Sequence, residues 1–155
     1  MENLVKNIVK NAKILKDKYT DQKDALINYA CIFCQSDKEE KNFLKLAHEL
    51  GTVIQETKAG PVFKIPPLNT VAGKLQLLKI RNPDLAKPER EDADFSITDY
   101  LSFKEKYLNK PGFSLIQKEN FEMIELYEKG SNVRVYFSFP PLDEQLGLKY
   151  IKDVL

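Results

Sequence analysis

Apolar positions recur at helical spacing near the start of the chain and alternate with polar positions in several later segments. The alternation of apolar and polar residues at every second position is typical of strands with one buried face. Near the start, by contrast, the spacing of three and four residues predicts an amphipathic helix over residues 2–17, with an apolar face formed by Leu4, Val5, Ile8, Val9, Ala12 and Leu15.

A second helix is predicted from its capping residues. Ser36 stands three residues before Glu39, as in a capping box, where the serine side chain accepts a hydrogen bond from a backbone amide of the first turn. Gly51 follows the last apolar residue of this helix and is expected to be its C′ glycine. The helix lies between predicted strands, which are Leu26–Gln35, Thr52–Thr57, Pro61–Ile65 and Lys74–Arg81. The second and third of these strands form a hairpin, which Pro66-Pro67 is expected to end.

The same order of elements follows a second time. Residues 91–142 repeat the order found in residues 29–80: a strand, a capped helix and three further strands. The helix of this second half is expected to begin at Thr98 or Asp99 and to end before Lys110-Pro111-Gly112. The predicted strands of this half are Asp92–Ile97, Phe113–Gln117, Phe121–Tyr127 and Val133–Phe139.

These elements predict an α+β protein with one domain over residues 1–155. We divide it into an N-terminal helical extension (1–25), a first β-α-β-β-β unit (28–81), a linker (82–91), a second unit (92–140) and a C-terminal tail (141–155). The linker contains Pro83 and Pro88 among charged residues, which favours an irregular surface connection. The tail, Asp143–Leu155, is expected to form a short closing helix.

Composition and charge exclude several classes of protein. The 24 basic and 23 acidic side chains leave a net charge of +1, whereas nucleic-acid binding proteins usually carry a strongly basic face. No apolar run is long enough for a membrane helix, and the first residues do not resemble a signal peptide, so we expect a cytoplasmic protein without membrane or nucleic-acid partners. Cys31 and Cys34 lie in a predicted strand and are interpreted as buried thiols.

A β-α-β-β-β unit that occurs twice resembles the vicinal oxygen chelate superfamily, which includes glyoxalases, bleomycin-resistance proteins and extradiol dioxygenases. The segments that carry the resemblance are Phe33 to Gly51, Asp94 to Tyr100 and Phe121 to Phe137. The resemblance implies that the paired units form a half-open, cup-shaped mixed sheet. A ferredoxin-like dimer, or another α+β sandwich, is the alternative fold.

In that superfamily the cup surrounds a divalent metal, held by His and Glu side chains of the first and last strands of each unit. Here the equivalent positions fall near Ala30, Lys79, Asp92 and Arg134–Tyr136. Only Asp92 among them is a good metal ligand, because Lys and Arg offer hydrogen-bond donors alone. The single histidine, His48, lies within the second predicted helix. We therefore expect a divergent member without the usual metal ligands, and without a metal or other cofactor.

The strand alternation also predicts which side chains share the polar face. Lys79, Arg81 and Arg134 could hold a carboxylate or phosphate, because guanidinium groups pair with planar anions. Tyr136 would add a hydroxyl donor, and Asp92 or Asp94 an acceptor or base. The alternative is that these charges pair with one another across strands, for example Arg134 with Asp94, on a solvated sheet face.

Three functions remain open from the sequence. The first is a glyoxalase-like protein that binds a small polar or anionic ligand without a metal. The second is an enzyme of the lyase or isomerase type, in which Asp92 or Asp94 is the base and Arg134 and Tyr136 are the electrophilic donors. The third is a protein-interaction module that forms a homodimer.

Overall fold

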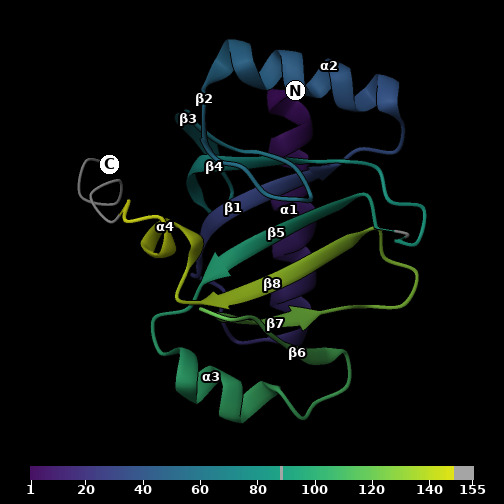
Figure 1. Ribbon diagram of the computed structural model, residues 1–155. Coiled ribbons are helices and arrows are strands. Elements are labelled where there is room, and N and C mark those ends of the chain that lie inside the picture. The colour runs from purple at the N-terminus through teal and green to yellow at the C-terminus, as the bar shows by residue number, and fades with distance from the viewer. Residues whose placement is uncertain (88, 149–155) are drawn as a thin grey trace.

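The computed structural model describes residues 1–87 and 89–148. It is an α+β fold with an N-terminal helix and one open, mixed sheet of eight strands (Figure 1). The elements in chain order are α1 (Glu2–Tyr19), β1 (Leu26–Phe33), α2 (Asp37–Leu50), β2 (Thr52–Gln55), β3 (Val62–Thr70), β4 (Gly73–Arg81), β5 (Glu91–Ser96), α3 (Tyr100–Tyr107), β6 (Phe113–Gln117), β7 (Glu122–Leu126), β8 (Val133–Phe139) and α4 (Leu142–Gln145).

The sheet confirms the predicted repeat. Its strand order is β2-β3-β4-β1-β5-β8-β7-β6, so that each unit contributes four adjacent strands in mirrored order. Within each unit the first strand runs parallel to the last, as β1 does to β4 and β5 to β8. The two units meet edge to edge through the antiparallel pair β1 and β5 at the centre of the sheet.

One hydrophobic core lies between the sheet and the helices α1, α2 and α3. The apolar face of α1 packs against the middle of the sheet through residues such as Val5, Ile8 and Val9. On the strands, Phe95 of β5 and Phe137 of β8 belong to this core, as the alternation predicts. The alternate residues of the same strands therefore point to the opposite face, away from these helices.

The helix starts are as predicted, but Gly51 has a different role. The Ser36 and Asp99 side chains cap α2 and α3 by accepting hydrogen bonds from the amides of Glu39 and Ser102. Gly51 has φ −151° and ψ −161°, which is extended backbone rather than the left-handed conformation of a C′ glycine. A Cβ at this position would lie 2.1 Å from the carbonyl oxygen of Lys64. The absence of a side chain thus lets α2 end close against β3.

Pro66-Pro67 does not end its strand. The strand β3 continues from Val62 to Thr70, and its pairing with β4 is interrupted between Lys64 and Leu68. A proline has no amide hydrogen for a sheet ladder, so the two prolines are accommodated where the register shifts. The next strand, β4, follows after a short turn.

In the described part of the predicted closing helix, Asp143–Gln145 belong to the short helix α4 (Leu142–Gln145), and residues 149–155 of that prediction lie outside the described residues. None of the helices in the described part of the chain combines the length and the apolar character that a membrane span needs.

Candidate functional site

A cavity of about 430 Å³ lies on the face of the sheet opposite to α1. Gln55 of β2 and Ile116 of β6, which belong to the two edge strands, both line it, so the sheet must curve around the cavity. The short helix α4 contributes Leu142 and Gln145 at one end. The volume falls within the range of small-molecule binding pockets, about 300–1,000 Å³.

Positive charge is concentrated in this cavity, although the whole chain is nearly neutral. Five basic side chains and one carboxyl group line it: Lys58, Lys79, Arg81, Lys87, Lys118 and Asp92. None of the five basic side chains forms an ion pair with a described residue. Unpaired cations in a concave surface attract and concentrate anions.

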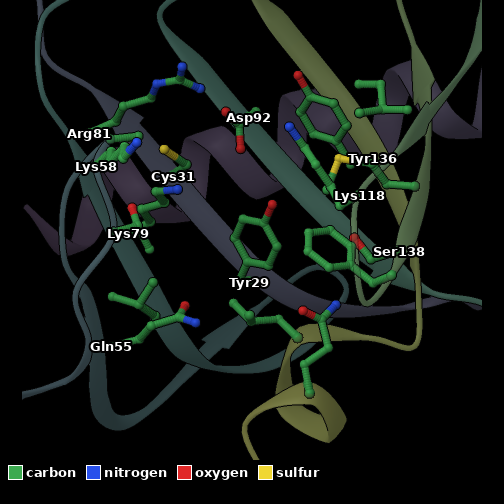
Figure 2. Close-up of a pocket in the computed structure, with 18 of the residues that line it drawn as sticks. Tyr29, Cys31, Gln55, Lys58, Lys79, Arg81, Asp92, Lys118, Tyr136 and Ser138 are labelled. Atoms are coloured by element: carbon green, nitrogen blue, oxygen red, sulfur yellow. The ribbon is translucent and has the colours of Figure 1, made fainter.

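Arg81 is held in place without a carboxylate partner. Its guanidinium lies over the ring of Phe33, with Cζ 4.5 Å from the ring centroid. Its Nε atom is buried and has no hydrogen-bond partner among the described residues. Lys79 stands two residues earlier on β4, on the same face of the strand (Figure 2). The two cations thus point into the cavity from one strand with donors still to be satisfied.

Asp92 lies between the cationic and the aromatic side chains on the floor of the cavity (Figure 2). Its side chain comes from β5, and the residue is only 5% exposed. Burial raises the pKa of this carboxyl group to about 7, although the nearby Lys79 and Arg81 act in the opposite direction. Burial, together with the charge of Asp92, also raises the pKa of the neighbouring Cys31 thiol well above its usual value. Asp92 is therefore able to change its charge near neutral pH, whereas Cys31 stays protonated.

Two tyrosines complete the floor. The Tyr136 hydroxyl donates a hydrogen bond to Oε2 of Glu125 over 2.9 Å. The Tyr29 hydroxyl makes no hydrogen bond to a described residue, and Figure 2 shows it pointing toward Asp92. Burial raises the pKa of both hydroxyl groups, so both are neutral donors at physiological pH.

The structure brings four of the six predicted site residues together in the cavity, namely Lys79, Arg81, Asp92 and Tyr136. Arg134 instead points to Glu125, at 3.3 Å, and Glu89, at 3.8 Å, and its Cζ lies 3.8 Å from the ring centroid of Tyr127. Its charge is thus compensated within the protein, although not by Asp94.

Asp94, the sixth predicted residue, is buried beneath the cavity floor. Its carboxyl group accepts hydrogen bonds from the hydroxyl and the backbone amide of Ser138. Burial raises the pKa of Asp94 to about 8, although the hydrogen bonds from Ser138 act in the opposite direction. Asp94 does not line the cavity, and its place in the structure is that of a buried link between β5 and β8.

Sequence reasoning missed several lining residues. Tyr29 and Cys31 share the cavity face of β1, but that strand is so apolar that its pattern did not indicate which face lines a site. Lys58, Lys87 and Lys118 come from loops, which have no periodicity to place them. Ser138 alternates with Tyr136 on β8, and this signal could have included it.

The donor set of the cavity does not fit a divalent cation. At the positions implied by the superfamily resemblance, the structure presents Lys79, Asp92 and Tyr136, with a protonated Cys31 beside them. The described residues contain no group of three or more His, Cys, Asp or Glu side chains arranged to bind a metal. A cation here would meet one carboxyl group and the repulsion of Lys79 and Arg81.

Comparisons with known proteins give similarity at the level of the fold. No protein-family model matches the chain, and no curated protein is significantly similar to it. A solved structure entitled "Structural Genomics, Protein EC4020" is similar with a TM-score of 0.71 and 10% identity, over 95% of this chain and 90% of that one. A glyoxalase/bleomycin resistance protein/dioxygenase superfamily member from Vibrio splendidus 12B01 gives a TM-score of 0.43 and 10% identity, over 71% of this chain and 95% of that one. At these identities the first likeness shows the fold alone, and the second, with its low TM-score, carries no argument.

Proposed function

We propose that this protein is a divergent, glyoxalase-like domain that binds a small anionic ligand in the cavity, without a metal. The observation that carries the proposal is the cluster of unpaired cations, above all Lys79 and Arg81, in a concave site of a nearly neutral chain. An anion would satisfy the guanidinium donors of Arg81 and the ammonium donors of Lys79. The hydroxyl of Tyr29 adds a neutral donor to the same ligand.

The metal-free part of the proposal rests on the donor set. Two cationic side chains face the only carboxyl group of the described lining, and they lower the affinity of the site for any further cation. The same two side chains raise its affinity for an anion. The charge that would oppose metal binding therefore supports the binding of an anionic ligand.

The test is thermal unfolding of the full chain with acetate, hexanoate, phosphate and hexyl phosphate, and separately with Zn²⁺ or Mn²⁺ with and without a chelator. A ligand that binds only the folded state raises the midpoint of unfolding. We expect an anion to raise it, and Lys79→Gln and Arg81→Gln each to reduce the effect strongly. Lys74→Gln, at the exposed start of the same strand, is the matched control and should behave as the wild type. Stabilisation by a metal that the chelator reverses would contradict the proposal.

A second candidate function is proton transfer by Asp92, which would make the protein an enzyme of the lyase or isomerase type. The observation in its favour is that burial raises the pKa of Asp92 to about 7, a value suited to a general acid or base at neutral pH. Asp92 also faces the space that a ligand held by Lys79 and Arg81 would occupy. Exchange of a C–H proton of a bound ligand with deuterium, followed by NMR and lost in Asp92→Asn, would support this activity.

The third expectation, a homodimeric interaction module, stays a prediction. The large exposed apolar residues of the described chain are distributed over separate elements, such as Ile14 on α1, Val71 after β3 and Leu101 on α3. Light scattering after size-exclusion chromatography measures the oligomeric state directly.

A further inference from the structure

The two sides of the cavity differ in chemistry. Lys79 and Arg81 come from β4, the exposed Lys58 comes from the loop between β2 and β3, and the exposed Lys87 comes from the connection between β4 and β5. The second unit contributes apolar side chains on the other side, namely Ile116 of β6 and Phe121 and Met123 at β7.

The sheet keeps these two groups apart. In the strand order, β4 is separated from β7 and β6 by the three strands β1, β5 and β8. Those three strands form the floor and contribute Tyr29, Cys31, Asp92, Tyr136 and Ser138. Figure 2 shows Arg81, Lys58 and Lys79 on one side of Asp92 and Tyr29, and Tyr136, Ser138 and Lys118 on the other. Lys118 is the one basic residue on the second side, and it is exposed.

From this segregation we infer that the ligand is an amphipathic organic anion, whose carboxylate or phosphate group lies against Lys79 and Arg81 and whose apolar body lies against Ile116, Phe121 and Met123. The inference rests on the proposed function and specifies its ligand class. An inorganic anion would leave the apolar side in contact with water. A neutral apolar molecule would leave the donors of Arg81 and Lys79 unsatisfied, which is unfavourable at a partly buried site.

Carboxylates and phosphate monoesters share the chemistry that these cations recognise, so the head group and the apolar body are tested separately. Acetate, butanoate and hexanoate vary the body at a constant head group, and hexyl phosphate varies the head group at a constant body. Hexan-1-ol has the body without the charge, and inorganic phosphate has the charge without the body. Binding of each to the full chain is measured by calorimetric titration or, for the weakest, by the shift in thermal unfolding.

We expect affinity to rise about threefold for each added methylene group from acetate to hexanoate, because each buries apolar surface. Met123→Gln and Ile116→Thr should reduce this gain, whereas acetate binding should not change. Leu101→Gln, which replaces an apolar residue that is 67% exposed on α3, is the matched control and should bind as the wild type. Hexan-1-ol and inorganic phosphate should each bind at least tenfold more weakly than the better of hexanoate and hexyl phosphate.

Equal affinities for acetate and hexanoate would overturn the inference and leave the proposed function in place. If hexan-1-ol binds as tightly as hexanoate while acetate still binds, the inference is also overturned and the proposed function again remains. If none of the anions binds, both the inference and the proposed function fail. The methylene series is measured on the wild-type chain, so these outcomes do not depend on the folding of any variant.

Discussion

Arg81 and Phe33 are directly paired in the sheet, and the guanidinium of Arg81 lies over the Phe33 ring with Cζ 4.5 Å from the centroid. An aromatic ring attracts a cation through the negative charge of its face, but it does not accept the planar hydrogen bonds that a guanidinium donates to a carboxylate. Phe33 therefore orients Arg81 and leaves its donors available to a ligand.

Replacement of Arg81 should weaken anion binding more than it weakens the fold. We expect Arg81→Gln to reduce affinity for hexanoate about tenfold or more, since charge-assisted hydrogen bonds contribute about 1.5–3 kcal/mol each. Arg81→Lys keeps the charge but loses the planar donors, and an intermediate affinity is expected. Calorimetric titration measures the affinities, with Lys74→Gln as the control. Unchanged affinity in Arg81→Gln would place the anion elsewhere.

Replacement of Arg134 should weaken the fold more than it weakens anion binding. Arg134 is 14% exposed in its side chain and lies against Glu125 and Glu89, whose exposures are 19% and 5%. Arg134→Met leaves these two carboxylates without their cation, so we expect the free energy of unfolding to fall by about 2 kcal/mol. Urea denaturation measures this change, and affinity for hexanoate should stay within about threefold of the wild type. A large loss of affinity with unchanged stability would return Arg134 to the binding site.

Anion affinity should depend on pH through Asp92. Its pKa is about 7 in the folded protein because burial raises it against the effect of Lys79 and Arg81. Below pH 7 the carboxyl group is neutral, and above it the negative charge repels an anion bound beside it. We therefore expect affinity for hexanoate, which stays ionised over this range, to fall about tenfold between pH 6 and pH 8.5.

Asp92→Asn tests this pH dependence. Asparagine has the shape of a protonated aspartate, so the variant should lose most of this pH dependence and bind hexanoate more tightly than the wild type at pH 8.5. The part that remains is expected from Asp94 beneath the floor, whose pKa burial raises to about 8. The groups that influence Asp92 are Lys79 and Arg81 of β4, Cys31 of β1 and Glu89 of the connection before β5. His48, the single histidine, lies on α2 outside the cavity lining. A pH profile that Asp92→Asn leaves unchanged would contradict the role of Asp92.

Local sequence patterns predicted much of the fold, and the same patterns predicted part of the candidate site. Alternation placed Asp92 of β5 and Tyr136 of β8 on the face opposite to the core, and the capping residues Ser36 and Asp99 marked the starts of both helices in the repeat. These features depend only on residues close in sequence, because the two-residue period of a strand sets the face of each side chain and the cap geometry sets the first residue of a helix.

The partners of the charged residues could not be predicted in this way. Arg134 meets Glu125 because the β7–β8 hairpin sets Glu125 directly opposite Tyr136, and this register depends on the turn between the strands. Arg81 has no such carboxylate on its neighbouring strands. The strand alternation placed Arg81 and Arg134 alike on the polar face. Only the tertiary arrangement shows that Arg134 is paired with carboxylates, whereas Arg81 is available to a ligand.

Asp94 and Ser138 allow a test of the fold itself. In the unfolded chain Asp94 should have a pKa near 3.8, whereas burial raises it to about 8 in the folded protein. Between these values the folded state keeps a proton that the unfolded state loses, so this group makes stability fall as pH rises from about 4 to about 8. Asp92 contributes in the same direction up to about pH 7.

We expect Asp94→Asn to remove the larger part of this decline, on the order of several kcal/mol between pH 5 and pH 8, because asparagine does not ionise. Its amide can still accept the hydrogen bond from the Ser138 hydroxyl through the side-chain oxygen. Urea denaturation at intervals of half a pH unit gives the free energy of unfolding of wild type and variant. Ser138→Ala is the matched comparison, since it removes the hydrogen bond but leaves the carboxyl group, and it should retain the decline. If wild type and Asp94→Asn show the same pH dependence, Asp94 is ionised in the folded protein and its place beneath the cavity floor must be revised.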